Sequence, residues 1–431
     1  MKKYFLFTFL ALIISGNALA SEPLDTLTDK SVIMTSDEMP VQIFEPFILA
    51  TLGSLNYYGP APSMNSYDDI LFTYTARTPY GLRLLTHDEV KMPDLETLYE
   101  SYGYNKAVKH RIDYFSGKNK KSFSKKLSRA GRYIDLMAAI LTEKGLPIEL
   151  TYLPLIESGF DTLAYSPKRA AGPWQFIPAT ARTFGLKIDW WVDERRDPVK
   201  STEAAAEYLL HLHERFDNWN LALAAYNTGE GRISNAIKKV KESSYWKISK
   251  AGYIARETRN YVPSFIAAVS IAIEPENFGF HEIERQEPLR YDTVEIETPM
   301  DLAVAAKLTG VKTSVIKELN PELRRWCTPP NIVSYTLKIP EGTKDMFLSG
   351  LSNTEDSELF YVEHYQIKSG DTVWNIARRL GTNIQAITAV NSLGKKAIIV
   401  AGKTILVPVD RDKGINGSYG GLKPILKSRT L

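Results

Sequence analysis

The last third of the chain repeats itself, and this repeat constrains the fold more than any other feature of the sequence. Matching residues recur at an offset of 71: Ala306 with Ala377, Gly310 with Gly381, and Leu319-Asn320 with Val390-Asn391. Each copy predicts a strand, two helices and a second strand. The chain is therefore multidomain, with two small βααβ units at residues 291–341 and 361–408. Gly, Ser, Asn and acidic residues gather over 342–358, which we interpret as a linker.

Ahead of the repeat, residues 95–275 carry a helical pattern. Apolar residues recur at three- and four-residue steps, as at Ile134, Met137, Ala138 and Leu141. Further helical stretches are predicted at 202–216, 221–226 and 261–273. The pair Asp197-Pro198 is typical of a helix start, because aspartate caps a helix and proline fits its first turn. We expect a mostly α-helical domain here, so the fold class is multidomain α+β.

The first twenty residues predict a secretory signal peptide. Lys2 and Lys3 precede a short apolar run, and Ala18-Leu19-Ala20 supplies the small residues before cleavage after Ala20. The alternative is a transmembrane anchor, but the apolar run is shorter than the roughly 20 residues that a spanning helix needs. No cysteine lies near Ala20 to carry a lipid. Residues 21–94 mix Pro, Gly, Asn and Tyr without a period, and we assign this N-terminal extension no role.

Charge and cysteine content exclude several classes of function. The chain has 53 basic and 50 acidic residues, which is too balanced for a general nucleic-acid binder. From residue 361 to the end there are 11 basic and 4 acidic residues, a net +7 that includes a basic tail at 409–431. The single cysteine, Cys327, forbids an intramolecular disulfide. None of the six histidines forms a metal-binding helical pair. We therefore expect no metal and no cofactor.

One carboxylate stands out as a candidate general acid. Glu157 ends an apolar run that begins at Pro147, and the run predicts four buried neighbours: Leu150, Leu153, Leu155 and Ile156. Apolar surroundings disfavour an ionised carboxylate, so they raise its pKa toward neutrality and let it donate a proton. The alternative is a solvated glutamate at a helix end.

Three further clusters add the groups that a sugar-binding site uses. Aromatic rings stack on sugar faces, and amides hydrogen-bond to hydroxyl and acetamido groups. The clusters are Gly172 to Gln175 with Trp174, Ala225 to Gly229 with Tyr226 and Asn227, and Glu257 to Val262 with Tyr261. Taken singly, each cluster is more often core or capping than functional. Their order along the chain favours function.

Together these motifs resemble the lytic transglycosylase (SLT) branch of the goose-type lysozyme superfamily, from about residue 127 to 269. Val192-Asp-Glu-Arg-Arg-Asp-Pro198 is part of the same resemblance. The resemblance implies that Glu157 is the only catalytic acid/base and that Ser158 and Tyr261 hold it. It implies glycan binding by five residues: Gln175, Tyr226, Asn227, Gly172 and Trp174. It also implies cleavage of the MurNAc-β-1,4-GlcNAc bond of peptidoglycan without water, to 1,6-anhydro-MurNAc ends, in the periplasm.

The second repeat copy, residues 361–408, resembles the LysM peptidoglycan-binding module. The resemblance places the turn Gly370-Asp371-Thr372 beside a groove for N-acetylglucosamine, whereas the alternative role for Asp371 is to cap the following helix. The first copy has Pro299-Met300-Asp301 at the matching positions. We therefore expect a degenerate LysM-like unit at 291–341 with weak or no affinity for glycan.

Two other functions stay open on the sequence alone. A lysozyme-type hydrolase would need a second carboxylate, for which Glu257 is a weak candidate. A catalytically inactive wall-binding scaffold would use the LysM module only. In each case the partner is the glycan strand of peptidoglycan, and the sequence identifies no protein regulator.

Overall fold

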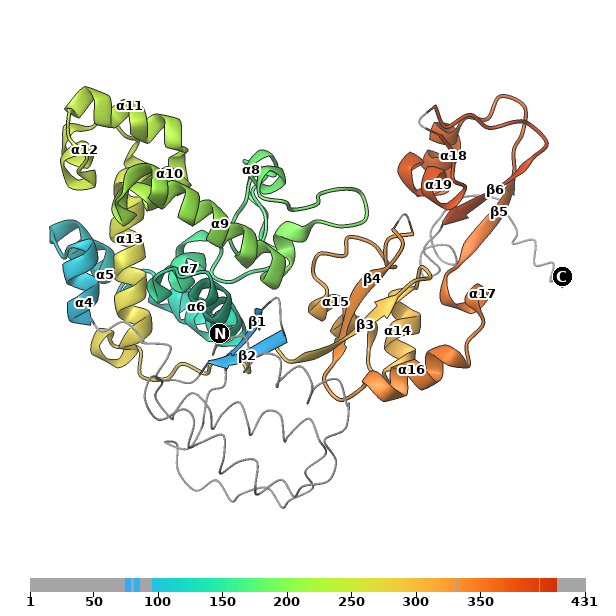
Figure 1. The fold of residues 1–431 in the computed structure, drawn as a ribbon, viewed down its shortest axis with the longest axis horizontal. Helices are drawn as coiled ribbons and strands as arrows, with labels where there is room; N and C mark the ends of the chain where they lie inside the picture. Colours follow the sequence, from blue (N-terminus) through green and yellow to red (C-terminus); the bar gives the residue numbers. More distant parts are fainter. Residues whose placement is uncertain (1–73, 79–80, 86–94, 331, 395, 409–431) are drawn as a thin grey trace, which may run out of the picture.

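A computed structural model describes residues 74–78, 81–85, 95–330, 332–394 and 396–408 (Figure 1). The predicted signal peptide, most of the N-terminal extension and the basic tail lie outside the described residues. Within the extension, β1 (Tyr74–Thr78) and β2 (Gly81–Leu85) pair as an antiparallel hairpin, with Tyr74 opposite Leu85.

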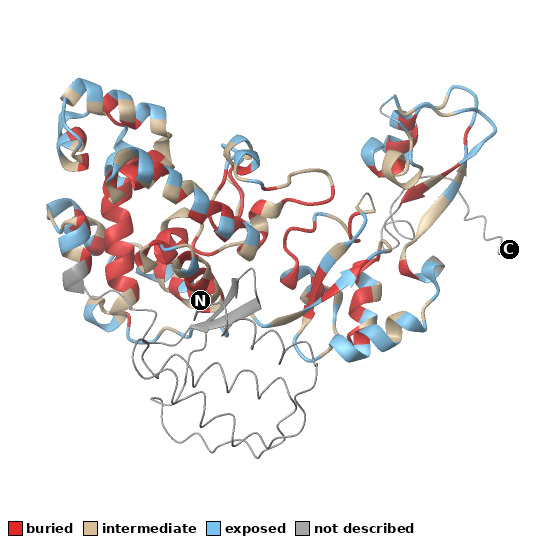
Figure 2. Ribbon diagram, in the orientation of Figure 1, coloured by how far each residue is buried: buried red, intermediate tan, exposed pale blue. Residues whose placement is uncertain are grey.

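The prediction of a mostly α-helical fold ahead of the repeat is confirmed. Its elements are α4 (Leu95–Tyr102), α5 (Lys106–Ser116), α6 (Lys120–Glu143), η3 (Ile148–Tyr152), α7 (Leu153–Glu157), α8 (Pro178–Thr183), η4 (Glu194–Arg196), α9 (Pro198–Phe216), α10 (Trp219–Thr228), α11 (Glu230–Val240), α12 (Tyr245–Ala251), α13 (Arg256–Ile273) and η5 (Pro275–Phe278). Helix α13 lies at its centre, against α4, α5, α7 and α10. A helix that is apolar on all sides must be buried, and every residue of α13 from Tyr261 to Ala272 is buried (Figure 2).

Local signals fix where the neighbouring helices begin and end. Gly145 has φ of +74° just after α6, a conformation that glycine adopts without a steric cost. Asp197 caps α9 as predicted, because its Oδ1 accepts hydrogen bonds from the backbone N–H groups of Val199 (2.8 Å) and Lys200 (3.2 Å). Pro198 occupies the first turn of α9.

Both repeat copies fold as βααβ units, as predicted. The first unit contains β3 (Tyr291–Ile296), α14 (Leu302–Leu308), α15 (Thr313–Leu319) and β4 (Tyr335–Pro340), and the second contains β5 (Val362–Gln366), α18 (Val373–Arg379), α19 (Ile384–Val390) and β6 (Thr404–Pro408). Each pair of strands is antiparallel.

The matching asparagines of the repeat make the same pair of hydrogen bonds in both units. The Asn320 side chain donates to the carbonyl of Lys338 (2.7 Å) and accepts from its N–H (2.9 Å). Asn391 makes the same pair of bonds to the backbone of Leu406, at 2.6 and 2.8 Å. Each asparagine therefore ties the end of the second helix to the last strand, which explains why it recurs.

The predicted linker at 342–358 is wrong. This stretch forms α16 (Lys344–Ser352) and most of α17 (Asp356–Leu359), and α16 packs on α14 and β3. Phe347 and Leu359 are buried in the core of the first unit. The apolar side chains of this segment are separated by polar and glycine residues, so composition alone suggested a linker. The first unit extends to Leu359.

Candidate active site

Glu157 lies at the C-terminal end of α7, half-buried behind the fully buried Leu153 and Leu155. The Tyr261 hydroxyl, on α13, donates a hydrogen bond to Glu157 Oε1. Burial raises the pKa of Glu157 to about 7. The Tyr261 bond and the Lys126 charge act against this rise, while the Glu257 charge adds to it. The predicted rise in pKa is confirmed, so the carboxyl can hold or release a proton near neutral pH.

Two phenols lie near this carboxyl, the buried Tyr261 and the partly buried Tyr226. Burial raises the pKa of Tyr226 and of Tyr261 well above its usual value, and the Glu157 charge adds to both shifts. Both hydroxyls therefore stay protonated and act as hydrogen-bond donors. Tyr261 donates to Glu157, whereas Tyr226 donates to the carbonyl of Trp174 at 2.8 Å. Only the carboxyl of this group changes charge near neutrality.

The turn Gly172–Gln175 lies beside these groups and is held by side chains around it. Ser158 Oγ donates to the Pro173 carbonyl (2.9 Å), and Trp174 Nε1 donates to Thr202 Oγ1 on α9 (2.8 Å). Gln175 has φ of +49°, which is unusual for a residue with a side chain. Its Nε2 donates to the Gly172 carbonyl at 2.9 Å. Backbone strain of this kind is often found at functional sites.

Three of the predicted site residues lie differently from what the motifs suggested. Trp174 is 0% exposed and bonded to Thr202, so the structure contradicts stacking of its ring on a sugar. Gly172 is buried against the Arg195 carbonyl and offers no binding group. Ser158 bonds to Pro173, so it holds the turn and not Glu157. Each of these placements depends on a partner at least 15 residues away in sequence, which the motifs do not specify.

The two remaining residues predicted to bind glycan, Gln175 and Asn227, are half-buried. Gln175 belongs to the turn, and Asn227 Oδ1 accepts from Thr258 Oγ1 on α13 at 2.9 Å. Glu257, the weak candidate for a second carboxylate, has a side chain that is 65% exposed and pairs with Lys168 at 3.3 Å. That surface ion pair does not give the arrangement of two facing carboxylates that a hydrolase uses.

Sequence reasoning missed two features near the turn. Arg195 Nη1 donates to the carbonyls of Arg169 (2.6 Å) and Phe176 (2.9 Å), so it holds both ends of the loop that contains the turn. The motif Val192–Pro198 contains Arg195, but the sequence alone assigned this motif no role. Tyr165, 59% exposed, forms a β-bridge with Ala171 next to the turn. An exposed aromatic ring at such a place carries no distinctive sequence signal.

The Gly370–Thr372 turn of the second unit is organised around Asp371. Asp371 Oδ2 accepts from the Lys368 N–H (2.8 Å) and the Tyr365 hydroxyl (2.7 Å). Thr372 is the helix cap, because its Oγ1 accepts from the Asn375 N–H at 3.1 Å. The alternative role of Asp371 as cap is therefore wrong. Trp374, 54% exposed, follows in the first turn of α18.

The matching turn of the first unit is covered by the chain itself. Met300 is fully buried, and the N–H of Asp301 donates to the carbonyl of Leu359 at 2.8 Å. The C-terminal end of α17 therefore lies beside the turn.

No group of three or more His, Cys, Asp or Glu side chains in the described part of the chain could hold a metal ion. No helix there is long and apolar enough to cross a bilayer.

The raised pKa of Glu157 makes stability depend on pH. Below pH 4.5 the folded and unfolded chains both hold the proton, but between pH 4.5 and 7 only the unfolded chain ionises, so the fold loses stability as pH rises. Glu157→Gln removes this loss. We expect its stability relative to the unsubstituted chain to rise by about 3 kcal/mol from pH 4 to pH 8. Urea unfolding at both pH values measures the difference. Glu257→Gln, at an exposed ion pair, should show no comparable rise.

Family profiles match all three parts of the chain. The profile described as "Transglycosylase SLT domain" matches residues 137–249. The profile "Lytic transglycosylase MltD, LysM-like domain" matches 290–355, which agrees with the extended first unit, and "LysM domain" matches 365–408. The chain belongs to the family of lytic transglycosylases with an SLT domain.

Individual relatives are similar over different spans. Membrane-bound lytic murein transglycosylase D of Escherichia coli (strain K12) is 32% identical over 280 residues, which are 62% of this chain and 61% of that protein. The chain thus spans about three fifths of that relative. A putative tributyltin chloride resistance protein of Alteromonas sp. (strain M-1) is 37% identical over 167 residues, or 35% of this chain and 81% of that protein. Peptidoglycan transglycosylase gp16 of Escherichia phage T7 is 35% identical over 128 residues, 28% and 9% of the two chains.

Proposed function

We propose that the chain is a peptidoglycan lytic transglycosylase that cleaves the MurNAc-β-1,4-GlcNAc bond without water and leaves 1,6-anhydro-MurNAc ends. One observation carries the proposal: a single carboxyl, Glu157, has a pKa near neutrality between two phenols that stay protonated. A group of that pKa can give up and regain a proton in one catalytic cycle. The name of the E. coli relative points to the same reaction.

The reaction uses Glu157 twice. The protonated carboxyl transfers its proton to the bridging oxygen as the bond from that oxygen to C1 of the muramyl sugar breaks. The acetamido group of this sugar stabilises the positive charge at C1. The carboxylate then removes the proton of the same sugar's C6 hydroxyl as its oxygen bonds to C1. The attacking hydroxyl is already part of the substrate, so ring closure benefits from proximity.

The surrounding residues have separate tasks in this proposal. Tyr261 orients the carboxyl, while Gln175 and Asn227 hydrogen-bond to the glycan next to the cleaved bond. Ser158, Tyr226 and Trp174 hold the turn that carries Gln175. The exposed ring of Tyr165 gives the glycan a stacking surface at the edge of the turn.

The domain assignment belongs to the same proposal. Residues 95–275 carry out the cleavage, and the LysM module at 361–408 retains the enzyme on the wall. Export with cleavage after Ala20 places the enzyme in the periplasm, where its substrate lies.

The test is digestion of purified sacculi, with the released muropeptides identified by mass spectrometry. Products that lack one water relative to hydrolytic fragments support the proposal. Hydrated reducing ends indicate a hydrolase and contradict it. Absence of any product, with binding to sacculi intact, indicates the scaffold function.

The role of the second unit in retention gives a separate prediction. Asp371→Ala removes the carboxylate that holds the Lys368 N–H and the Tyr365 hydroxyl, so the turn should lose its shape. We expect affinity for sacculi to fall about 10-fold, equivalent to about 1.4 kcal/mol. Co-sedimentation with sacculi measures it. Glu363→Ala makes the same change of charge on β5 and should leave affinity unaltered; an equal loss in both variants would point to charge alone.

A further inference from the structure

A short segment of the helical domain joins the active-site turn to the first βααβ unit. We call residues 189–197 the connecting segment. Trp191 and Val192 are buried in the core of the first unit, and Val192 forms a β-bridge with Leu323. The Asp193 N–H donates to the Glu322 carbonyl at 2.9 Å, and the Arg324 N–H donates to the Trp191 carbonyl at 2.8 Å. The segment is thus packed and hydrogen-bonded as though it belonged to the first unit.

The same segment holds the active-site turn from the other side. The guanidinium of Arg195 makes two hydrogen bonds of 2.8 Å to the Asp193 carboxylate, and the two side chains are 3% and 4% exposed. Arg195 also donates to the carbonyls of Arg169 and Phe176, which bracket Gly172–Gln175. A buried bidentate pair has little freedom to move. The position of the turn therefore follows the position of the connecting segment.

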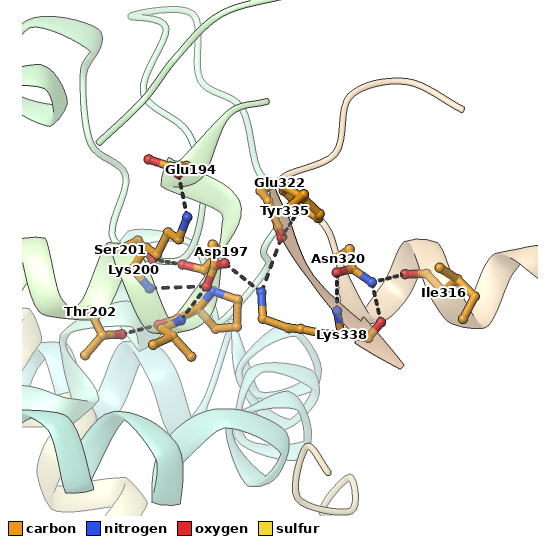
Figure 3. Close-up of polar contacts among 12 residues, drawn as sticks. Glu194, Asp197, Lys200, Ser201, Thr202, Ile316, Asn320, Glu322, Tyr335 and Lys338 are labelled. Carbon is orange, nitrogen blue, oxygen red and sulfur yellow. Dashed lines mark hydrogen bonds and ion pairs between the residues drawn. The ribbon is translucent and has the colours of Figure 1, made fainter. Parts of the chain in front are cut away.

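Lys338, on β4 of the first unit, lies at the centre of this junction (Figure 3). Its Nζ is 2.6 Å from Asp197 Oδ2 and 3.3 Å from Glu322 Oε1, and all three side chains are buried. Burial disfavours the ammonium form, but the two carboxylates outweigh it and raise the pKa of Lys338. Glu322 also accepts from the Tyr335 hydroxyl at 2.7 Å.

Asp197 carries the effect of Lys338 toward the active site. Its second oxygen, Oδ1, caps α9, and α9 supplies Thr202, which accepts the Trp174 hydrogen bond within the turn. Two routes therefore lead from the first unit to the turn, one through Asp193 and Arg195 and one through Asp197 and α9. Without the Lys338 ammonium, Asp197 would be a buried carboxylate that has lost its cation, and such groups are strongly unfavourable.

We infer that the first βααβ unit acts in catalysis as a positioning element: Lys338 locks it onto the connecting segment and so fixes the turn that presents Gln175 to the glycan. Lys338 is a positioning residue, since it contacts no substrate. The covered turn at Met300 and Asp301 fits a unit with this task rather than one that binds glycan. The inference rests on the proposed function only for its catalytic consequence.

The test uses the full chain with Lys338→Met, a side chain of similar length without charge. On soluble, uncross-linked glycan we expect kcat to fall about 10-fold while KM changes less than about 2-fold, because displacement of positioned groups by an ångström slows the chemical step. Retention on sacculi should stay the same. Hydrogen–deuterium exchange should be faster in peptides covering 169–176 and unchanged in peptides covering 261–272.

Two further variants separate positioning from general loss of stability. Glu318→Gln breaks the ion pair to Arg132 (2.9 Å), which also joins the first unit to the helical domain but does not contact the connecting segment. We expect no change in kcat or in exchange. Lys338→Arg keeps the cation and should recover part of kcat. If Lys338→Met does not fold, Tyr335→Phe removes only the bond to Glu322 and should give a smaller change in the same direction.

The outcomes divide clearly. Unchanged kcat and unchanged exchange at 169–176 in Lys338→Met would overturn the inference. Loss of retention with normal kcat would also overturn it, by assigning the first unit to glycan binding. If the unsubstituted chain forms no anhydro products, the proposed function fails, but the exchange measurement still decides whether the unit holds the turn.

Discussion

Replacement of Glu157 by glutamine is expected to slow the release of anhydro-muropeptides from sacculi by at least about 10³-fold. The substitution keeps the shape of the side chain. On the proposed function it removes the group that moves both protons, and general acid–base catalysis contributes about 10²–10⁴-fold at each such site. Tyr261 cannot replace it, because burial raises the pKa of this phenol and holds it protonated. Initial rates of release, measured by mass spectrometry, give the ratio.

Glu149→Gln is the matched control. Glu149, on η3 of the same domain, is buried, and burial raises its pKa as well. It lies outside the group around the turn, so its replacement should leave the rate within about 2-fold. An equal loss in both variants would show that the domain tolerates neither change. A rate that survives in Glu157→Gln would remove Glu157 from the mechanism.

Gly172→Ala is expected to destabilise the fold by about 3–4 kcal/mol. A Cβ atom at this position would lie 1.7 Å from the Arg195 carbonyl oxygen, and the backbone φ is +79°. The alanine thus combines a clash with fixed backbone and a left-handed conformation, each of which costs about 1–3 kcal/mol. The clash is relieved only if the turn moves away from the Arg195 carbonyl. Urea unfolding measures the loss, and sacculus digestion should fall with it.

Gly185→Ala separates the two causes. Gly185 has nearly the same φ, +81°, but no atom lies within 4 Å of the place that an alanine methyl group would take. Its replacement should therefore cost only the conformational term, about 1 kcal/mol. Equal losses at both glycines would mean that contact with Arg195 does not matter.

Local features of the fold were predictable because their causes are local. Apolar spacing predicted α13, Asp197-Pro198 predicted the start of α9, and the apolar run before Glu157 predicted its raised pKa. The repeated asparagines marked the two units because each closes the same backbone contact. Such signals are contained in short stretches of sequence.

Features that depend on distant partners were not predictable. Trp174 is buried in the core of the helical domain, where Thr202, 28 residues away, accepts a hydrogen bond from its N–H, and this changes an expected sugar-binding ring into a support. Lys338 meets Asp197 across 141 residues, so no motif contains both. Phe347 and Leu359 are structural residues only because they pack into the core of the first unit. In each case the partner, and not the residue type, decides the role.

The short connection between the two βααβ units limits how far they can move relative to each other. Only Phe360 and Tyr361 separate α17 from β5, and Phe360 packs on the core of the first unit while Tyr361 packs on that of the second. Because both connecting residues pack on a core, they cannot act as a flexible linker. On the proposed function, a bound LysM module therefore holds the acid near a small set of glycan bonds at a high effective concentration, and each binding event samples one neighbourhood of the wall.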